Sequence, residues 1–167
     1  MNGPESVPER PLDLMGLLAV MASHHVDYLV VGGVAVQVHG HRRTTKDLDV
    51  VPAPQTDNYE RLAAALDELE AHQRGVDPAS VTVSPTDPER LRLASIVPPL
   101  TTMHGELHIL NEAKGGAPWE QMRARALVVD LDGVEVAIVG LDDLIRMKRA
   151  AGRKADIAVL TRLAGME

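Results

Sequence analysis

Two short apolar runs, separated by a pair of glycines and a polar loop, constrain the fold of this chain most strongly. They occupy residues 30–51, VVGGVAVQVHGHRRTTKDLDVV. The apolar run before Gly32 and Gly33 is typical of a buried strand, and the glycines interrupt it. Asp47 and Asp49 then stand two positions apart at the start of the second run. Because alternate residues of a strand point to one face, the two carboxylates are expected side by side.

Two neighbouring carboxylates have a chemical consequence, because they repel each other and are costly to desolvate without a compensating cation. Carboxylate oxygens suit hard divalent cations that bridge to substrate phosphates. Gly32 and Gly33, between a strand and a short helix, would let backbone N–H groups approach an anion closely. Arg43 and Thr45 continue the face of the aspartates if the strand extends that far back. The pattern indicates phosphoryl or nucleotidyl transfer.

Length and composition place these motifs in an ordinary globular chain. The chain has 167 residues, of which 45% are hydrophobic and 25% charged, which predicts one domain over residues 11–167 after a disordered tail at 1–10. The absence of cysteine excludes disulfides, thiol catalysis and cysteine-ligated metal sites. No apolar run approaches the roughly 20 residues of a membrane span, and the polar beginning is unlike a signal peptide. We therefore expect a cytoplasmic protein with no membrane partner.

Hydrophobic periodicity predicts helices and strands that alternate without a regular βαβ repeat. This mixture favours an α/β or α+β fold, with a mixed sheet flanked by helices and a short helical C-terminus. Residues 126–130 and 134–139 are expected to form a β-hairpin, and Asp142-Asp143 to cap the helix that follows. Strands are expected at 28–31, 47–51, 81–83, 91–97, 107–110, 126–130 and 134–139, and helices at 12–23, 34–39, 56–72, 119–125, 142–151 and 154–163.

The charge is unevenly distributed along the chain. A net charge of −7 argues against a protein that coats nucleic acid, but residues 144–163 carry six basic residues and one acid. Lys148 shares a helix face with the apolar Leu144, so it either snorkels to solvent or directs its ammonium group at phosphates. Asp156 shares a face with Leu160, so it is either an inward-facing acid or an ordinary helix-start acid.

These motifs resemble those of a known family. Gly32-Gly33, thirteen residues and then Asp47-Leu48-Asp49 resemble the signature of the nucleotidyltransferase superfamily, which has a polymerase-beta-like fold. The closer likeness is to the bacterial branch of abortive-infection and toxin–antitoxin nucleotidyltransferases. The stretch GELHILNEAKGG (105–116) is similar to the central strand segment of that branch, and LDDLIRMKRAAGRKADIAVLTRL (141–163) to its lysine-helix motif. The resemblance spans about residues 28–163.

The resemblance implies a nucleotidyltransferase that moves NMP from an NTP substrate to an acceptor hydroxyl. By this resemblance, Asp47 and Asp49 bind Mg²⁺ or Mn²⁺, and Lys148 and Asp156 belong to the active site. The acceptor is expected to be an RNA end, such as that of tRNA, or a protein side chain, and the biological role that of a toxin with an antitoxin partner. The residues expected to contact the nucleotide are Gly32, Gly33, Arg43, Thr45 and Lys148.

One position departs from the family pattern. The superfamily commonly has a third carboxylate on a central strand, as metal ligand or general base, and the resemblance places His108 there. Four interpretations remain open at this point: His108 as base or metal ligand, Glu106 on the same strand face as a substitute, Asp156 acting alone, or a weakened enzyme. The last leads to an alternative function, a nucleotidyltransferase-fold protein that binds or regulates without turnover. A small-molecule nucleotidyltransferase is a third possibility, for which the chain is short.

Overall fold

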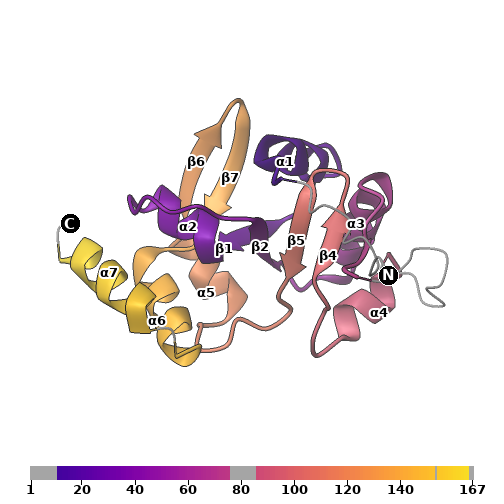
Figure 1. The fold of residues 1–167 in the computed structure, drawn as a ribbon. Coiled ribbons are helices and arrows are strands. Elements are labelled where there is room, and N and C mark those ends of the chain that lie inside the picture. The colour runs from indigo at the N-terminus through magenta and orange to yellow at the C-terminus, as the bar shows by residue number, and fades with distance from the viewer. Residues whose placement is uncertain (1–10, 76–85, 153, 166–167) are drawn as a thin grey trace, which may run out of the picture.

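The computed structural model describes residues 11–75, 86–152 and 154–165, which form one mixed seven-stranded sheet with helices around it (Figure 1). The expected tail at 1–10 and strand at 81–83 lie outside the described residues. The strands are β1 (Tyr28–Val31), β2 (Asp47–Pro52), β3 (His72–Gln73), β4 (Leu100–Thr102), β5 (Gly105–Ile109), β6 (Leu127–Leu131) and β7 (Val134–Ile138). The helices are α1 (Leu14–Ser23), α2 (Gly32–Val38), α3 (Thr56–Glu68), α4 (Pro88–Leu93), α5 (Trp119–Ala124), α6 (Leu141–Ala150) and α7 (Lys154–Ala164).

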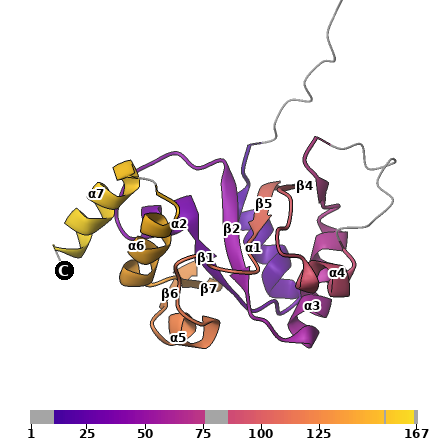
Figure 2. The same ribbon diagram turned by 90° about the horizontal axis from the view of Figure 1, so that it is seen from below.

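The centre of the sheet carries the motifs found in the sequence. The strand order is β3-β4-β5-β2-β1-β7-β6. All four residues of β1 are buried, and this strand pairs antiparallel with β2 and parallel with β7. β2 in turn pairs parallel with β5. Figure 2 shows α2 and α6 to one side of β2 and α3 and α4 to the other. The expected mixed sheet flanked by helices is thus confirmed.

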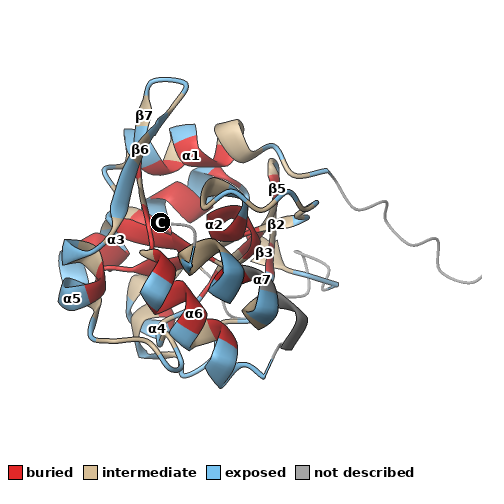
Figure 3. Cartoon of the chain, turned by 90° about the vertical axis from the view of Figure 1, so that its left-hand side faces the viewer, coloured by how far each residue is buried: buried red, intermediate tan, exposed pale blue. Residues whose placement is uncertain are grey.

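Burial follows the amphipathic patterns of the sequence. Leu48 and Val50 of β2 are fully buried, whereas Asp47 and Asp49 between them are only partly so. Figure 3 shows helices such as α1 and α6 with one buried and one exposed side, as expected for helices that cover a sheet. None of the helices in the described part of the chain is long and apolar enough to span a membrane.

The β6–β7 hairpin is confirmed. Asp132 and Gly133 connect its strands, and both adopt positive φ angles, 52° and 87°. A two-residue turn with this backbone matches the right-handed twist of the flanking strands, which is why Asp-Gly between apolar runs predicts a hairpin.

Three local expectations are wrong. Residues 91–97 are not a strand, because Asp87 accepts hydrogen bonds from the backbone N–H groups of residues 89 and 90 and Pro88 occupies the first turn, so that α4 forms instead. The helix beginning at Thr56 ends at Glu68 rather than at residue 72, and Thr56 is its first residue, not its cap. The short strands β3 and β4 were not expected at all.

The Asp142-Asp143 pair also differs from expectation. Gly140 is the N-cap of α6, and neither aspartate caps the helix. Asp143 is instead buried, with 1% of its side chain exposed. Its carboxylate accepts hydrogen bonds from Arg125 Nε and Nη2, at 2.9 and 2.8 Å, and from Arg146 Nη1 at 3.2 Å. Asp143 therefore links α6 to Arg125, the residue that follows α5.

Candidate active site

A polar patch lies where β2 and β5 run side by side. In the parallel register Asp47 is opposite Glu106, and Asp49 is opposite His108. Paired residues of neighbouring strands share a face of the sheet. The expectation that Asp47 and Asp49 share a face is therefore met, and β5 adds one acid and one histidine to it. We call Asp47, Asp49, Glu106 and His108 the β2–β5 cluster.

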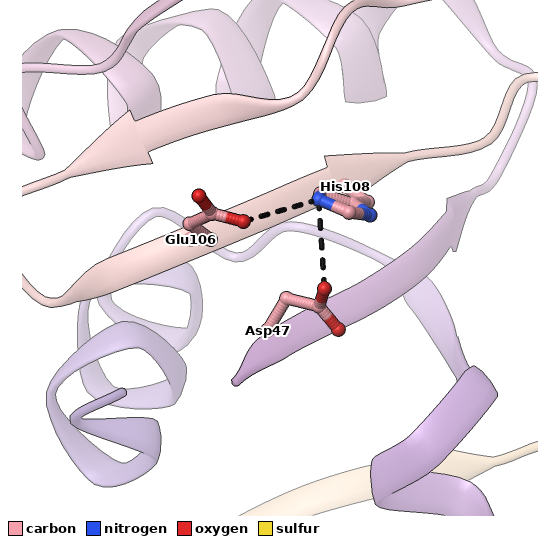
Figure 4. A group of neighbouring side chains, drawn as sticks. All are labelled: Asp47, Glu106 and His108. Atoms are coloured by element: carbon pink, nitrogen blue, oxygen red, sulfur yellow. Dashed lines mark ion pairs between the residues drawn. The ribbon is translucent and has the colours of Figure 1, made fainter. Parts of the chain in front are cut away.

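The imidazole of His108 is the centre of this cluster. Its Nδ1 lies 3.1 Å from Asp49 Oδ1, and its Nε2 lies 3.6 Å from Asp47 Oδ2 and 3.5 Å from Glu106 Oε2. Figure 4 shows the ring of His108 directed between the carboxylates of Glu106, on its own strand, and Asp47, on the next. Nε2 is buried and makes no hydrogen bond to any described residue. One nitrogen is thus fixed by a partner, while the other faces two acids.

The carboxylates raise the pKa of His108 above its ordinary value of 6.5. The hydrogen bond that the ring donates to Asp49 is the largest cause of the raised pKa, burial opposes it, and the charges of Asp47, Asp49 and Glu106 add to the rise. When it is protonated, the ring adds a positive charge among the acids of the cluster.

This pKa gives a prediction for the metal-free protein. Because the folded-state pKa of His108 exceeds 6.5, its contribution to stability is complete below pH 6.5 and is lost as the pH rises through the folded-state pKa. A titration of the histidine ring protons by NMR should give His108 a midpoint above 6.5, and Asp49→Asn should lower it. A midpoint below 6.5 in the unsubstituted protein would contradict the arrangement.

The glycine turn lies directly against this cluster. Gly32 has a φ of +66°, and a Cβ at this position would lie 2.0 Å from Asp49 Oδ2. A Cβ on Gly33 would lie 2.8 Å from Thr45 Oγ1 and 3.9 Å from Arg43 Nε. The loop before β2 therefore folds back over the beginning of α2, and only glycines leave room for the two side chains and the carboxylate.

The contact between Gly32 and Asp49 predicts a loss of stability in Gly32→Ala. A left-handed alanine costs about 1 kcal/mol, and displacement of a half-buried carboxylate should bring the total to about 2–4 kcal/mol. Gly133→Ala is the matched control, because Gly133 also has positive φ but open space around its Cβ position. Denaturant unfolding measures both variants, and equal losses would show that the contact with Asp49 is unimportant.

The other residues expected in the site are placed to different degrees. Thr45 lies before β2 rather than in it, and its hydroxyl donates to the Asp47 carbonyl oxygen at 3.0 Å. Lys148 is buried on α6, with 8% of the residue exposed, and so is Leu144 on the same helix face. Figure 1 shows α6 close to α2. The side chain of Asp156, in the first turns of α7, lies outside the described residues.

Arg74 is a member of the site that the sequence did not indicate. Its Nη1 lies 3.1 and 3.2 Å from the two carboxylate oxygens of Glu106, so it orients that acid and balances part of its charge. Arg74 precedes Glu106 by 32 positions in the sequence and lies just after the two-residue strand β3. No local signal could have revealed this contact, because it depends on the pairing of β3, β4 and β5.

Comparison with solved structures identifies the fold. No protein-family model and no curated protein matches the sequence. The antibiotic-resistance factor ANT(2'')-Ia superimposes with a TM-score of 0.55 at 13% identity, over 90% of this chain and 80% of that one. An antigenic nucleotidyltransferase-like protein from Paracoccidioides brasiliensis gives 0.55 at 15%, over 92% and 79%. A candidate nucleotidyltransferase from Thermotoga maritima gives 0.54 at 11%, over 92% and 91%.

The chain has the nucleotidyltransferase fold. The fold expected from the glycine and aspartate motifs is therefore confirmed, and these likenesses span nearly the whole chain. In this nucleotidyltransferase fold the β2–β5 cluster and the Gly32-Gly33 turn lie at adjacent strands of the sheet centre. The likeness to toxin–antitoxin members of the superfamily stays a prediction.

Proposed function

We propose that the protein is a metal-dependent nucleotidyltransferase that moves NMP from an NTP to an acceptor hydroxyl. The observation that carries this proposal is the contact of Gly32 with the carboxylate of Asp49, beside Asp47. It joins a backbone turn that can approach phosphates and a pair of oxygen ligands in one place, within a nucleotidyltransferase fold.

Asp47 and Asp49 are the proposed ligands of the Mg²⁺ or Mn²⁺ ion that accompanies the NTP. Their carboxylates fit such an ion, because both are partly exposed on one face of the sheet and both lie beside the His108 ring. Asp49 Oδ1 faces that ring while Oδ2 faces the glycine turn, so this side chain connects both halves of the site. When bound, the metal neutralises charge on the phosphates and polarises the reacting phosphoryl group.

The triphosphate is proposed to lie along the Gly32-Gly33 turn. Neither glycine has a side chain to obstruct it, and Arg43 and Thr45 border Gly33. Arg43 then supplies positive charge to the phosphates, and Lys148 adds a second cation from the buried face of α6. Asp156 stays a proposed member of the site on the strength of the family resemblance alone.

The acceptor hydroxyl is proposed to give its proton to the carboxylate of Glu106 as its oxygen attacks the α-phosphorus. Glu106 Oε2 and His108 Nε2 lie 3.5 Å apart, and Arg74 holds the glutamate in place. A new bond forms between the acceptor oxygen and the α-phosphorus, and pyrophosphate leaves with the electrons of the broken bond. Glu106 thereby takes the role that the superfamily commonly gives to a carboxylate at the position of His108.

An RNA end is the acceptor that the charges favour. Arg42 and Lys46 are exposed in the loop before β2, and Arg146 and Arg149 are exposed on α6. Helices α6 and α2 lie to the same side of β2 (Figure 2), so a polyanionic acceptor would be attracted to the cations of α6 and of the loop that follows α2. Modification of tRNA by a toxin with a cognate antitoxin is the biological role we propose.

A labelling experiment tests this proposal. The purified chain is incubated with each α-labelled NTP, Mg²⁺ or Mn²⁺ and total RNA, and parallel reactions contain bulk protein or antibiotics as acceptors. We expect label on RNA together with an equal amount of pyrophosphate. Label on protein or on an antibiotic would instead retain nucleotidyl transfer and replace the acceptor.

A second candidate is a nucleotide-binding regulator without turnover. It is favoured by the contacts of the His108 ring with both Asp47 and Asp49, because a protonated imidazole there competes with the metal. Saturable NTP binding with no label on any acceptor would support this candidate over the enzyme.

A further inference from the structure

His108 has the environment of a metal-ligating histidine. In such histidines one ring nitrogen usually donates to a carboxylate or carbonyl oxygen, which fixes the tautomer and directs the lone pair of the other nitrogen at the metal. Asp49 Oδ1 is the acceptor that Nδ1 needs, at 3.1 Å. Nε2 is buried and has no hydrogen-bond partner among the described residues. The orphaned nitrogen is thus oriented by a neighbouring acid and is available to a metal.

Two carboxylates face the same nitrogen. Asp47 Oδ2 and Glu106 Oε2 lie 3.6 and 3.5 Å from Nε2. Asp47, Glu106 and His108 each offer one donor atom, and these three atoms all lie within 4.8 Å of one another. Donors that share one ion at about 2.1 Å are roughly 3.0–3.5 Å apart. The three side chains therefore need only small adjustments to bind a common cation.

The backbone and a neighbouring arginine fix this arrangement. Asp47 and Glu106 are opposite one another in the β2–β5 register, and His108 is the next residue on that face of β5. Because rigid strands position all three side chains, little freedom is lost when they bind an ion. Arg74 contacts both oxygens of Glu106 and orients this carboxylate as Asp49 orients the imidazole.

We propose that Asp47, Glu106 and His108 form a mixed nitrogen–oxygen metal site that selects a transition-metal dication of the Mn²⁺ class over Mg²⁺. Carboxylates suit Mg²⁺ and Mn²⁺ alike, but imidazole nitrogen is a ligand for transition metals and a poor one for Mg²⁺, which demands oxygen. The proposal deepens the proposed function, since it names the ion that the active site prefers, but metal binding by this triad needs neither nucleotide nor transfer.

Electron–nuclear double resonance of Mn²⁺ bound to the 167-residue chain tests this site directly. The metal-free chain is loaded with one equivalent of Mn²⁺ without nucleotide, and the ¹⁴N coupling of a ligating imidazole is recorded. Competition titrations give the preference for Mn²⁺ over Mg²⁺. We expect the nitrogen coupling in the unsubstituted protein, and its loss in His108→Asp with at least a roughly tenfold fall in the Mn²⁺ preference.

His104→Gln is the matched control for these measurements. His104 has the same 28% side-chain exposure as His108 and an aspartate partner, Asp13, at 3.0 Å from Nδ1, but among the described residues it forms no ion pair with a second acid. It should retain both the coupling and the preference. Glu106→Gln should keep the coupling while weakening Mn²⁺ binding about tenfold, which provides an answer even if His108→Asp does not fold.

Two results would overturn this inference. One is the absence of nitrogen coupling in the unsubstituted protein, and the other is a coupling that persists in His108→Asp. Nucleotide transfer with Mg²⁺ in a protein that shows no coupling would refute the mixed site and leave the enzyme intact. Nitrogen coupling without any nucleotide transfer would support the mixed site and refute the proposed enzyme. The failure of the metal site and the failure of the proposed function are therefore distinguishable.

Discussion

Replacement of Asp47 by asparagine should reduce nucleotide transfer on the order of 10³-fold while the protein remains folded. The substitution keeps the size of the side chain and removes one of the two charges that would hold the metal against the nucleotide, and loss of such electrostatic stabilisation has effects of this order. Asp47 is partly exposed at the beginning of β2, so neutralisation should not destabilise the fold strongly. Initial rates of label transfer at saturating NTP measure the effect.

The control for Asp47→Asn is Asp67→Asn. Asp67 is exposed on α3, on the other side of β2 from α2 in Figure 2. The two variants change net charge equally, so a general charge effect would appear in both. Unchanged transfer in Asp47→Asn would remove the main argument for a metal at the β2–β5 cluster.

Replacement of Asp143 by alanine should destabilise the fold by about 1–3 kcal/mol. The carboxylate of Asp143 is buried and accepts three hydrogen bonds from Arg125 and Arg146, which the substitution removes. The guanidinium groups are exposed, so water solvates them after the substitution and the loss stays below that of a fully buried ion pair. Denaturant unfolding monitored by circular dichroism measures the loss.

Asp142→Ala is the control for this prediction. Asp142 is adjacent in sequence and lies in the same helix turn, but it is exposed. Its replacement should change the unfolding free energy by less than about 0.5 kcal/mol. A similar effect in both variants would mean that the first-turn charge of α6 matters and that the buried pair does not.

The elements with strong local signals could be predicted from the sequence. The buried strand at 28–31 and its interruption at the glycines were expected, because continuous apolar residues and paired glycines act over a few positions. The helix expected from residue 34 begins earlier, at Gly32. The β6–β7 hairpin followed from the residues of its turn. A strand was wrongly expected at residues 91–97 because of their apolar content. Asp87 and Pro88, just before them, specify a helix start instead.

The candidate site was predictable only in part, for a physical reason. The shared face of Asp47 and Asp49 follows from the alternation within one strand. The contacts of His108 with these acids depend on which residue of β5 lies opposite which residue of β2, and this register is set by long-range packing. For the same reason four interpretations of the third-carboxylate position stay open from the sequence alone, and nothing in the sequence indicates Arg74.

Burial of charged residues on α6 shows the same division. The spacing of Leu144 and Lys148 placed the lysine on the apolar face, and the structure buries both. Asp143 offered no such pattern, since an acid in a first helix turn is ordinarily exposed. Its burial depends on Arg125, which reaches it from another element.

The most direct test of the central claim compares two labels in one reaction. The purified protein is incubated with an NTP labelled at the α-phosphorus or at the γ-phosphorus, with Mn²⁺ or Mg²⁺, and with RNA, bulk protein and antibiotics as acceptors. We expect the α label on the acceptor and the γ label only in pyrophosphate. Transfer of the γ label, or of neither label under conditions in which the NTP binds, would contradict nucleotidyl transfer by this protein.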